Sequence, residues 1–228
     1  MKLLDTNGGN LKLKKTEKSF EEYRLAGLSM MPNYRLCPGS KAADCMTDCL
    51  KSSGLAGVYK TVNEARQRKT DYFESNQTEF LKQLVKELAN FEKLCSKQGK
   101  KGAVRLNVLS DVNWEKLGIP QQFPNLFFYD YTKRAARLNS VDMPSNYKLM
   151  FSYSGSPKYQ SQVKLAEKTD APIAVVFKCK KLPKTFMGRE VVDGDESDLK
   201  NVLAGKVIIG LKAKGKARKS NSSFIVEV

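Results

Sequence analysis

Apolar residues recur at helical spacing in one part of the chain and in short continuous runs in another. From Gln77 to Lys97 they recur at every third or fourth position, which predicts an amphipathic helix ended by Gly99 and Gly102. The segment from Val58 to about Ser75 predicts a second, more highly charged helix before it. Residues 1–20 are polar and rich in lysine, and we expect them to form an arm or an edge strand.

The remainder of the chain predicts short strands separated by helical or irregular segments. The expected strands are 23–31, 103–109, 126–131, 147–151, 172–177, 206–211 and a last edge strand at 224–228. Such alternation is typical of βα units and a parallel sheet. With about six units, the sequence predicts one α/β domain over residues 1–228, built as a partial (β/α)6 TIM-like barrel. Its parts are a basic arm at 1–20, a cysteine loop at 37–49 and βα units over 103–215.

Three of the five cysteines occur in one stretch, with the spacing C-x7-C-x3-C at Cys37, Cys45 and Cys49. Pro38 and Gly39 favour a sharp bend that would bring the first thiol back to the other two. Three thiolates in one loop are typical of a metal site, so we expect a [4Fe-4S] cluster, with zinc or no metal as alternatives. The chain has no histidine, which removes the commonest fourth zinc ligand and the usual general base.

The remaining cysteines have different interpretations. Cys179 follows a predicted strand, where it is either a fourth ligand that closes the cluster or a free thiol. Cys95 lies near the end of a predicted amphipathic helix and is expected in the core. A disulfide-stabilised secreted protein fits less well, because the cysteine count is odd and lysines interrupt the segment after Met1. We therefore expect a cytoplasmic protein.

Polar residues follow several predicted strands, and the carboxyl ends of parallel strands meet on one face. The predicted ligand-binding residues at these ends are Asp111, Asp130, Lys133, Arg134, Ser152, Ser154 and Lys212. Carboxylates there suit an amine, a ribose hydroxyl or a proton, and the cations and hydroxyls suit an anion. The plainer alternatives are helix caps, ordinary turns and solvated side chains.

The formal net charge is +16, from 40 basic and 24 acidic residues. This excess favours phosphate-rich partners, either a small anionic or nucleotide-like ligand or nucleic acid, although a generic basic surface is an alternative. The sequence contains neither a P-loop nor a GxGxxG motif, and no apolar run long enough to predict a membrane span.

The order of strand, cysteine loop, helix and βα units resembles the partial barrel of radical S-adenosylmethionine enzymes. That resemblance implies a [4Fe-4S] cluster whose open iron binds S-adenosylmethionine; the spacing of the loop differs from the usual C-x3-C-x2-C. More specifically, the chain resembles the bacteriophage gene product 88 family. The phrases that carry this resemblance include Cys37-Pro38, Cys45-x3-Cys49-Leu50, Val104-Arg105-Leu106-Asn107, Ser110-Asp111, Phe128-Tyr129-Asp130-Tyr131 and Gly210-Leu211-Lys212-Ala213.

Together these observations predict an iron–sulfur protein that binds a small anionic ligand against its cluster. Whether it is an enzyme stays open, as does its oligomeric state. The alternative is a non-enzymatic basic module that binds nucleic acid or a host protein, in which a cluster or zinc is structural or redox-sensing.

Overall fold

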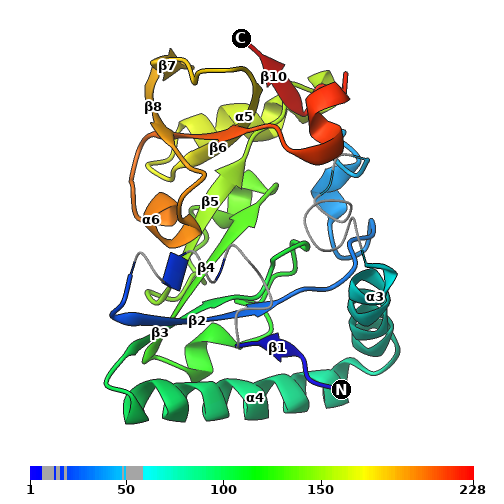
Figure 1. The fold of residues 1–228 in the computed structure, drawn as a ribbon, viewed down its shortest axis with the longest axis vertical. Helices are drawn as coiled ribbons and strands as arrows, with labels where there is room; N and C mark the ends of the chain where they lie inside the picture. Colours follow the sequence, from blue (N-terminus) through cyan, green and yellow to red (C-terminus); the bar gives the residue numbers. More distant parts are fainter. Residues whose placement is uncertain (7–12, 14–15, 18–19, 48, 50–58) are drawn as a thin grey trace.

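The computed structural model describes residues 1–6, 13, 16–17, 20–47, 49 and 59–228 (Figure 1). The strands are β1 (Leu4–Asp5), β2 (Tyr23–Leu28), β3 (Lys101–Arg105), β4 (Leu126–Thr132), β5 (Tyr147–Ser152), β6 (Ile173–Lys178), β7 (Thr185–Phe186), β8 (Arg189–Asp193), β9 (Ile208–Lys212) and β10 (Ile225–Glu227). The α-helices are α3 (Lys60–Ser75), α4 (Gln77–Lys97), α5 (Gln160–Glu167) and α6 (Asp198–Val202). Five short 3-10 helices lie between them: η1 (Pro38–Ser40), η3 (Pro120–Gln122), η4 (Ala135–Arg137), η5 (Pro157–Tyr159) and η6 (Gly215–Lys219).

The ten described strands form one open, mixed sheet in the order β1-β2-β3-β4-β5-β6-β9-β8-β7, with β10 pairing separately with β6. Pairing is parallel from β2 through β6 to β9 and β8, and β10 is also parallel to β6. The two edges are antiparallel, where β1 pairs with β2 and β7 with β8.

The prediction of a partial (β/α)6 TIM-like barrel is therefore wrong. A barrel of that kind needs a helix after nearly every strand to surround the sheet. Here α3 and α4 follow one another without a strand between them, and turns with one 3-10 helix each join β3 to β4 and β4 to β5. The hairpin of β7 and β8 also extends the sheet past β9, so that the two edge strands remain unjoined.

Opposite faces of the sheet bury their side chains in different clusters, as the twofold alternation of a strand requires. Phe128 packs in the cluster that receives the apolar face of α4, while Tyr129 packs in a cluster with Leu199 of α6. Figure 1 shows α4 lying along one end of the molecule and β10 at the other. A third cluster, around Phe151 and Tyr159, packs beneath α5 and extends to the cysteine loop.

Local patterns located most elements well. The helix predicted at 77–97 has those bounds, and the six strands predicted after it differ from the observed ones mostly by a few residues. Gly99, at φ +62°, follows the end of α4, but Gly102 lies inside β3, where a Cβ would come within 2.4 Å of Leu126. Strands β7 and β8 were not predicted, and much of the expected arm (7–12, 14–15 and 18–19) lies outside the described residues.

Among the described helices, none is both long enough and apolar enough to cross a membrane.

Candidate functional site

The cysteine loop folds through short-range backbone bonds. Cys37 precedes the 3-10 helix η1, and its carbonyl accepts hydrogen bonds from both the amide (3.0 Å) and the hydroxyl (2.6 Å) of Ser40. The Cys45 amide then donates to the Ser40 carbonyl at 3.3 Å, which closes the turn. Asp44, just before it, has a left-handed φ of +51°, a conformation that is unusual for a residue other than glycine.

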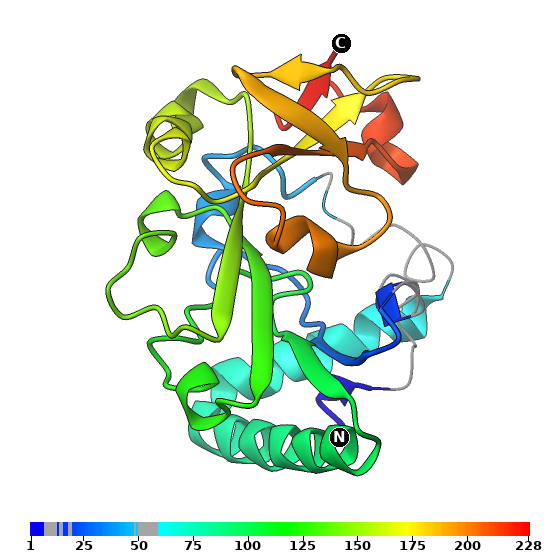
Figure 2. The same ribbon diagram turned by 90° about the vertical axis from the view of Figure 1, so that its left-hand side faces the viewer.

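This loop is held against the carboxyl ends of β4 and β5, as Figure 2 shows for the light-blue segment beside the green strands. The Ser154 hydroxyl donates to the Ala43 carbonyl at 2.7 Å. Gly39 lies so close to β4 that a Cβ there would be 2.7 Å from the Cβ of Lys133. The loop position therefore depends on a missing side chain at Gly39 and on a hydroxyl at the end of β5.

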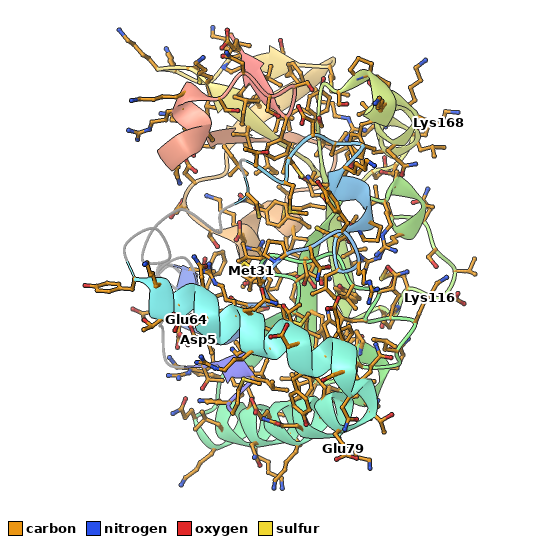
Figure 3. All side chains as sticks on the ribbon, turned by 90° about the vertical axis from the view of Figure 1, so that its right-hand side faces the viewer. Asp5, Met31, Glu64, Glu79, Lys116 and Lys168 are labelled. Atoms are coloured by element: carbon orange, nitrogen blue, oxygen red, sulfur yellow. The ribbon has the colours of Figure 1, made fainter. Side chains whose placement is uncertain are left out.

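The segment between β2 and the cysteine loop is fixed to helix α3 at Met31. The amide of Met31, labelled in Figure 3, donates to the Arg66 carbonyl at 3.2 Å, and the Thr70 hydroxyl donates to the Met31 carbonyl at 3.0 Å. Arg66 also lies within electrostatic reach of Cys49. Helix α3 thus adds a cation beside the last cysteine of the loop.

The three loop cysteines lie within electrostatic reach of one another. Burial, together with negative charge on Asp111, Cys45 and Cys49, raises the pKa of the Cys37 thiol to about 12, and Lys133 opposes the shift. The pKa of Cys45 is also raised by burial, while the charge and hydrogen bond of Lys133 lower it. Thiols that affect one another's ionisation share one electrostatic neighbourhood, and their joint binding of a metal stays a prediction.

The donor chemistry of the loop fits a thiolate-bound metal centre. It offers three thiols, which suit iron–sulfur clusters and zinc, and the neighbouring Lys133 and Arg66 would offset the charge of bound thiolates. In the described conformation, however, no group of three or more histidine, cysteine, aspartate or glutamate side chains is arranged to hold an ion. Residues 48 and 50–58, which flank Cys49, lie outside the described part of the chain.

Lys133 and Ser152, two of the predicted ligand-binding residues, lie next to the loop. The Lys133 ammonium donates to the Ser152 hydroxyl at 2.7 Å and lies 4.5 Å from the ring centre of Phe224. Tyr159 supports both strand ends, because its hydroxyl donates to the backbone carbonyls of Lys133 (2.7 Å) and Ser152 (3.0 Å). These contacts hold one ammonium and one hydroxyl beside the three thiols.

Asp111 is also beside the loop, but its carboxylate already has several partners. One oxygen accepts from Arg137 at 2.6 Å and from the Thr132 hydroxyl at 2.9 Å, and the other accepts from the Lys133 amide at 2.9 Å. Its own amide donates to the Leu36 carbonyl at 2.7 Å, one residue before Cys37. Asp111 therefore joins the loop to the end of β4.

Arg137, which sequence reasoning missed, completes this network. Its guanidinium forms a bidentate ion pair with the Glu115 carboxylate, at N–O distances of 2.8 and 2.7 Å, and a further ion pair with Asp111. Burial lowers the pKa of Arg137, but the bond and charge of Glu115, with Tyr147 and Asp111, raise it overall. The sequence gives no sign that Arg137 is buried, because it looks like any other basic residue after a strand. Only its partners Asp111 and Glu115, which lie more than 20 positions away in the chain, distinguish it from a solvent-exposed arginine.

Arg134 turns toward the same segment. It donates to the Asp111 carbonyl and to the Asn113 side chain, and it lies 3.6 Å from the Asp111 carboxylate, so its guanidinium binds groups of this segment rather than facing an open surface.

Asp130 is buried away from the loop, at 0 % exposure. Its carboxyl group accepts from the Asn107 amide at 2.7 Å and lies 2.8 Å from the Tyr147 hydroxyl. Burial raises the pKa of Asp130 to about 7, although Arg105, Tyr147 and Asn107 oppose the shift. Its position indicates a role in the core.

We expect Asp130 to make stability depend on pH. Because its pKa is raised in the folded state, the stabilising contribution is full below about pH 4 and is lost as the pH rises through about 7. The asparagine side chain of the variant Asp130→Asn cannot titrate. The free energy of unfolding of the wild type in urea should therefore exceed that of the variant by about 2 kcal/mol more at pH 5 than at pH 8. A difference in unfolding free energy between wild type and variant that is the same at both pH values, or larger at pH 8, would show that Asp130 is already ionised at pH 5.

Cys179 and Lys212 lie in another place. Both line a hollow of about 490 Å³ at the carboxyl ends of β6 and β9, together with several cations. Cys179 also packs at the margin of the apolar cluster that contains Cys45, and its role as a fourth ligand remains a prediction. Cys95 is buried at 3 % exposure among the residues that α4 packs against β3, as expected of a core cysteine.

Fold and loop together define the class of this protein: an α/β protein with an open, mostly parallel sheet and a cysteine loop held at the carboxyl ends of two strands. The family described as Gene product 88 matches residues 1–227, so the chain belongs to that family. This confirms the more specific of the two resemblances seen in the sequence, while the open sheet contradicts the barrel. No curated protein and no solved structure matches the chain.

Proposed function

We propose that Cys37, Cys45 and Cys49 bind an iron–sulfur cluster of the [4Fe-4S] type. The observation that carries this proposal is the packing of the cysteine loop against Lys133 and the end of β5, through Gly39 and Ala43, with the three thiols in electrostatic reach of one another. Such a cluster supplies one-electron chemistry or an iron that accepts a ligand. A reducing compartment such as the cytoplasm of a host cell is the environment that free thiols and such a cluster require.

The surroundings of the loop favour thiolate ligation. Lys133 and Arg66 place positive charge next to Cys45 and Cys49. Because Cys37 holds its proton strongly, binding must displace that proton, as it does at other thiolate sites. Binding also requires the sulfurs to draw closer than they lie in the described conformation. We expect residues 37–49 to adjust while β4 and β5 remain as they are.

A small anionic ligand would bind against this centre through Lys133 and Ser152. The ammonium and the hydroxyl are already joined at 2.7 Å, so they present two donors in a defined geometry. Lys133 is 9 % exposed, and in such a site the attraction of an ammonium for a carboxylate or phosphate is strengthened. S-adenosylmethionine is one ligand to examine, because its carboxylate could take the place of such an anion, although its sulfonium and ammonium groups make the whole molecule a cation.

The first test is the metal content of the protein purified without oxygen. We expect a brown protein with a broad absorption band near about 400 nm and about four irons and four sulfides per chain. A change in the electron paramagnetic resonance spectrum of the reduced protein on adding S-adenosylmethionine would support an open iron. A colourless protein that contains zinc, or no metal after reconstitution with iron and sulfide, would overturn the cluster.

A further inference from the structure

A second feature, separate from the cysteine loop, is the basic hollow at the carboxyl ends of β6 and β9. Its volume is about 490 Å³, and four of the residues that line it are cations: Lys178, Lys180, Lys212 and Arg218. They come from the end of β6, the end of β9 and helix η6, which lie side by side near β10 in Figure 1. Figure 3 shows side chains tipped with nitrogen around this helical turn.

Acidic residues neutralise only part of this charge. Lys178 is paired with Glu227 at 2.5 Å, and the neighbouring Lys214 is paired with Asp195 at 2.7 Å. Within the part of the chain that the structure describes, no ion pair involves the side chains of Lys180, Lys212 or Arg218. Three cations that form no described ion pair therefore line one hollow.

This arrangement lowers the stability of the folded protein, because like charges that lie close together repel one another. A bound anion with several charges removes that repulsion. The net charge of +16 acts in the same direction over a longer range, since it attracts polyanions to the surface.

We propose that this hollow binds phosphate groups of a nucleic-acid backbone. The ammonium groups of Lys180 and Lys212 act as point charges, and the guanidinium of Arg218 can bond two oxygens of one phosphate. An extended polymer suits the site better than a small molecule, because the hollow is open to the surface and Lys180 and Arg218 are exposed. The inference does not depend on metal binding by the cysteines, and the hollow should bind equally in metal-free protein.

The test compares two pairs of charge-removing substitutions in the full chain. Lys180→Gln with Arg218→Gln removes two cations from the hollow, while Lys82→Gln with Lys86→Gln removes two exposed cations from α4, at the other end of the molecule. The affinity for a labelled single strand of about 20 nucleotides is measured over a range of salt concentrations.

We expect the hollow variant to bind about tenfold more weakly at low salt, with a salt slope smaller by about 1.4, or about 0.7 for each lost phosphate contact. The α4 variant should keep the slope of the wild type. An equal loss in both variants would overturn the proposal, because it would show a general charge effect. Failure of the wild type to bind at low salt would also overturn it.

Cys179 gives a second readout, because this half-buried thiol lines the hollow. Bound oligonucleotide should slow its alkylation by iodoacetamide, as followed by mass spectrometry of the Cys179 peptide. If ATP or inorganic phosphate at the same phosphate concentration protected Cys179 equally well, the proposal of a nucleic-acid ligand would be overturned. The hollow would then be assigned to a small phosphate ligand. An unchanged alkylation rate with saturating oligonucleotide would place the nucleic acid elsewhere.

Discussion

Replacing Cys37, Cys45 and Cys49 together by alanine should reduce bound iron and sulfide from about four per chain to near zero and abolish the absorption near about 400 nm. The reason is the position of the three thiols in one electrostatic neighbourhood beside Lys133. No other cysteine of the chain lies in this loop. Iron and sulfide analysis of protein reconstituted without oxygen measures the effect directly.

Cys95→Ala is the matched control, because it removes a thiol from the α4 core and leaves the loop unchanged. This variant should keep the full iron content if it folds, which circular dichroism verifies for both proteins. If the triple variant retained its iron, the proposed cluster site would be wrong. Cys179→Ser then separates the two forms of cluster: unchanged iron content indicates an open iron, and loss of iron indicates a fourth thiolate.

Arg137→Met should lower the free energy of unfolding by about 3–5 kcal/mol. Arg137 is 5 % exposed and contacts both Asp111 and Glu115, so its removal leaves the buried Glu115 without its cation and Asp111 with only the longer ion pair to Arg134, at 3.6 Å. Methionine keeps much of the side-chain volume, which limits the contribution of a cavity. Urea unfolding followed by tryptophan fluorescence suits this measurement, because Trp114 is fully buried next to Glu115 in the sequence.

Lys82→Met is the control for Arg137→Met. Lys82 forms an exposed ion pair with Glu79 on α4 at 2.7 Å, and such pairs contribute little, so the unfolding free energy should stay close to that of the wild type. If both variants lost the same small amount, the network around Arg137 would not stabilise the fold as described. Since Asp111 joins the loop to β4, Arg137→Met should also weaken retention of iron.

Wherever a signal is local, the sequence predicted the structure well. Helix α4 follows from the spacing of Phe80, Leu84 and Leu88, whose side chains are all buried. The strands from β4 to β6 follow from short apolar runs between turns. The bend of the cysteine loop at Pro38 and Gly39 also follows from the sequence, and the structure has a 3-10 helix there.

The role of each polar residue at a strand end depended on distant partners. Asp111 and Asp130 look alike in the sequence, since each follows or ends an apolar run. One is paired with Arg137 beside the loop, and the other is enclosed among Asn107 and Tyr147 in the core. Lys133 reaches the thiols, whereas Lys212 faces a different hollow.

The sequence by itself determined the helical and strand periods, the cysteine loop and the positive charge, because neighbouring residues encode each of these. Tertiary structure alone decided that the sheet stays open, that Arg137 is buried and that the cations gather at β6 and β9. Strand order and ion pairing join residues far apart in the chain, such as Arg105 and Asp198 at 2.5 Å, and no local pattern records such a pairing. These features form only when the strands pack and the side chains find their partners.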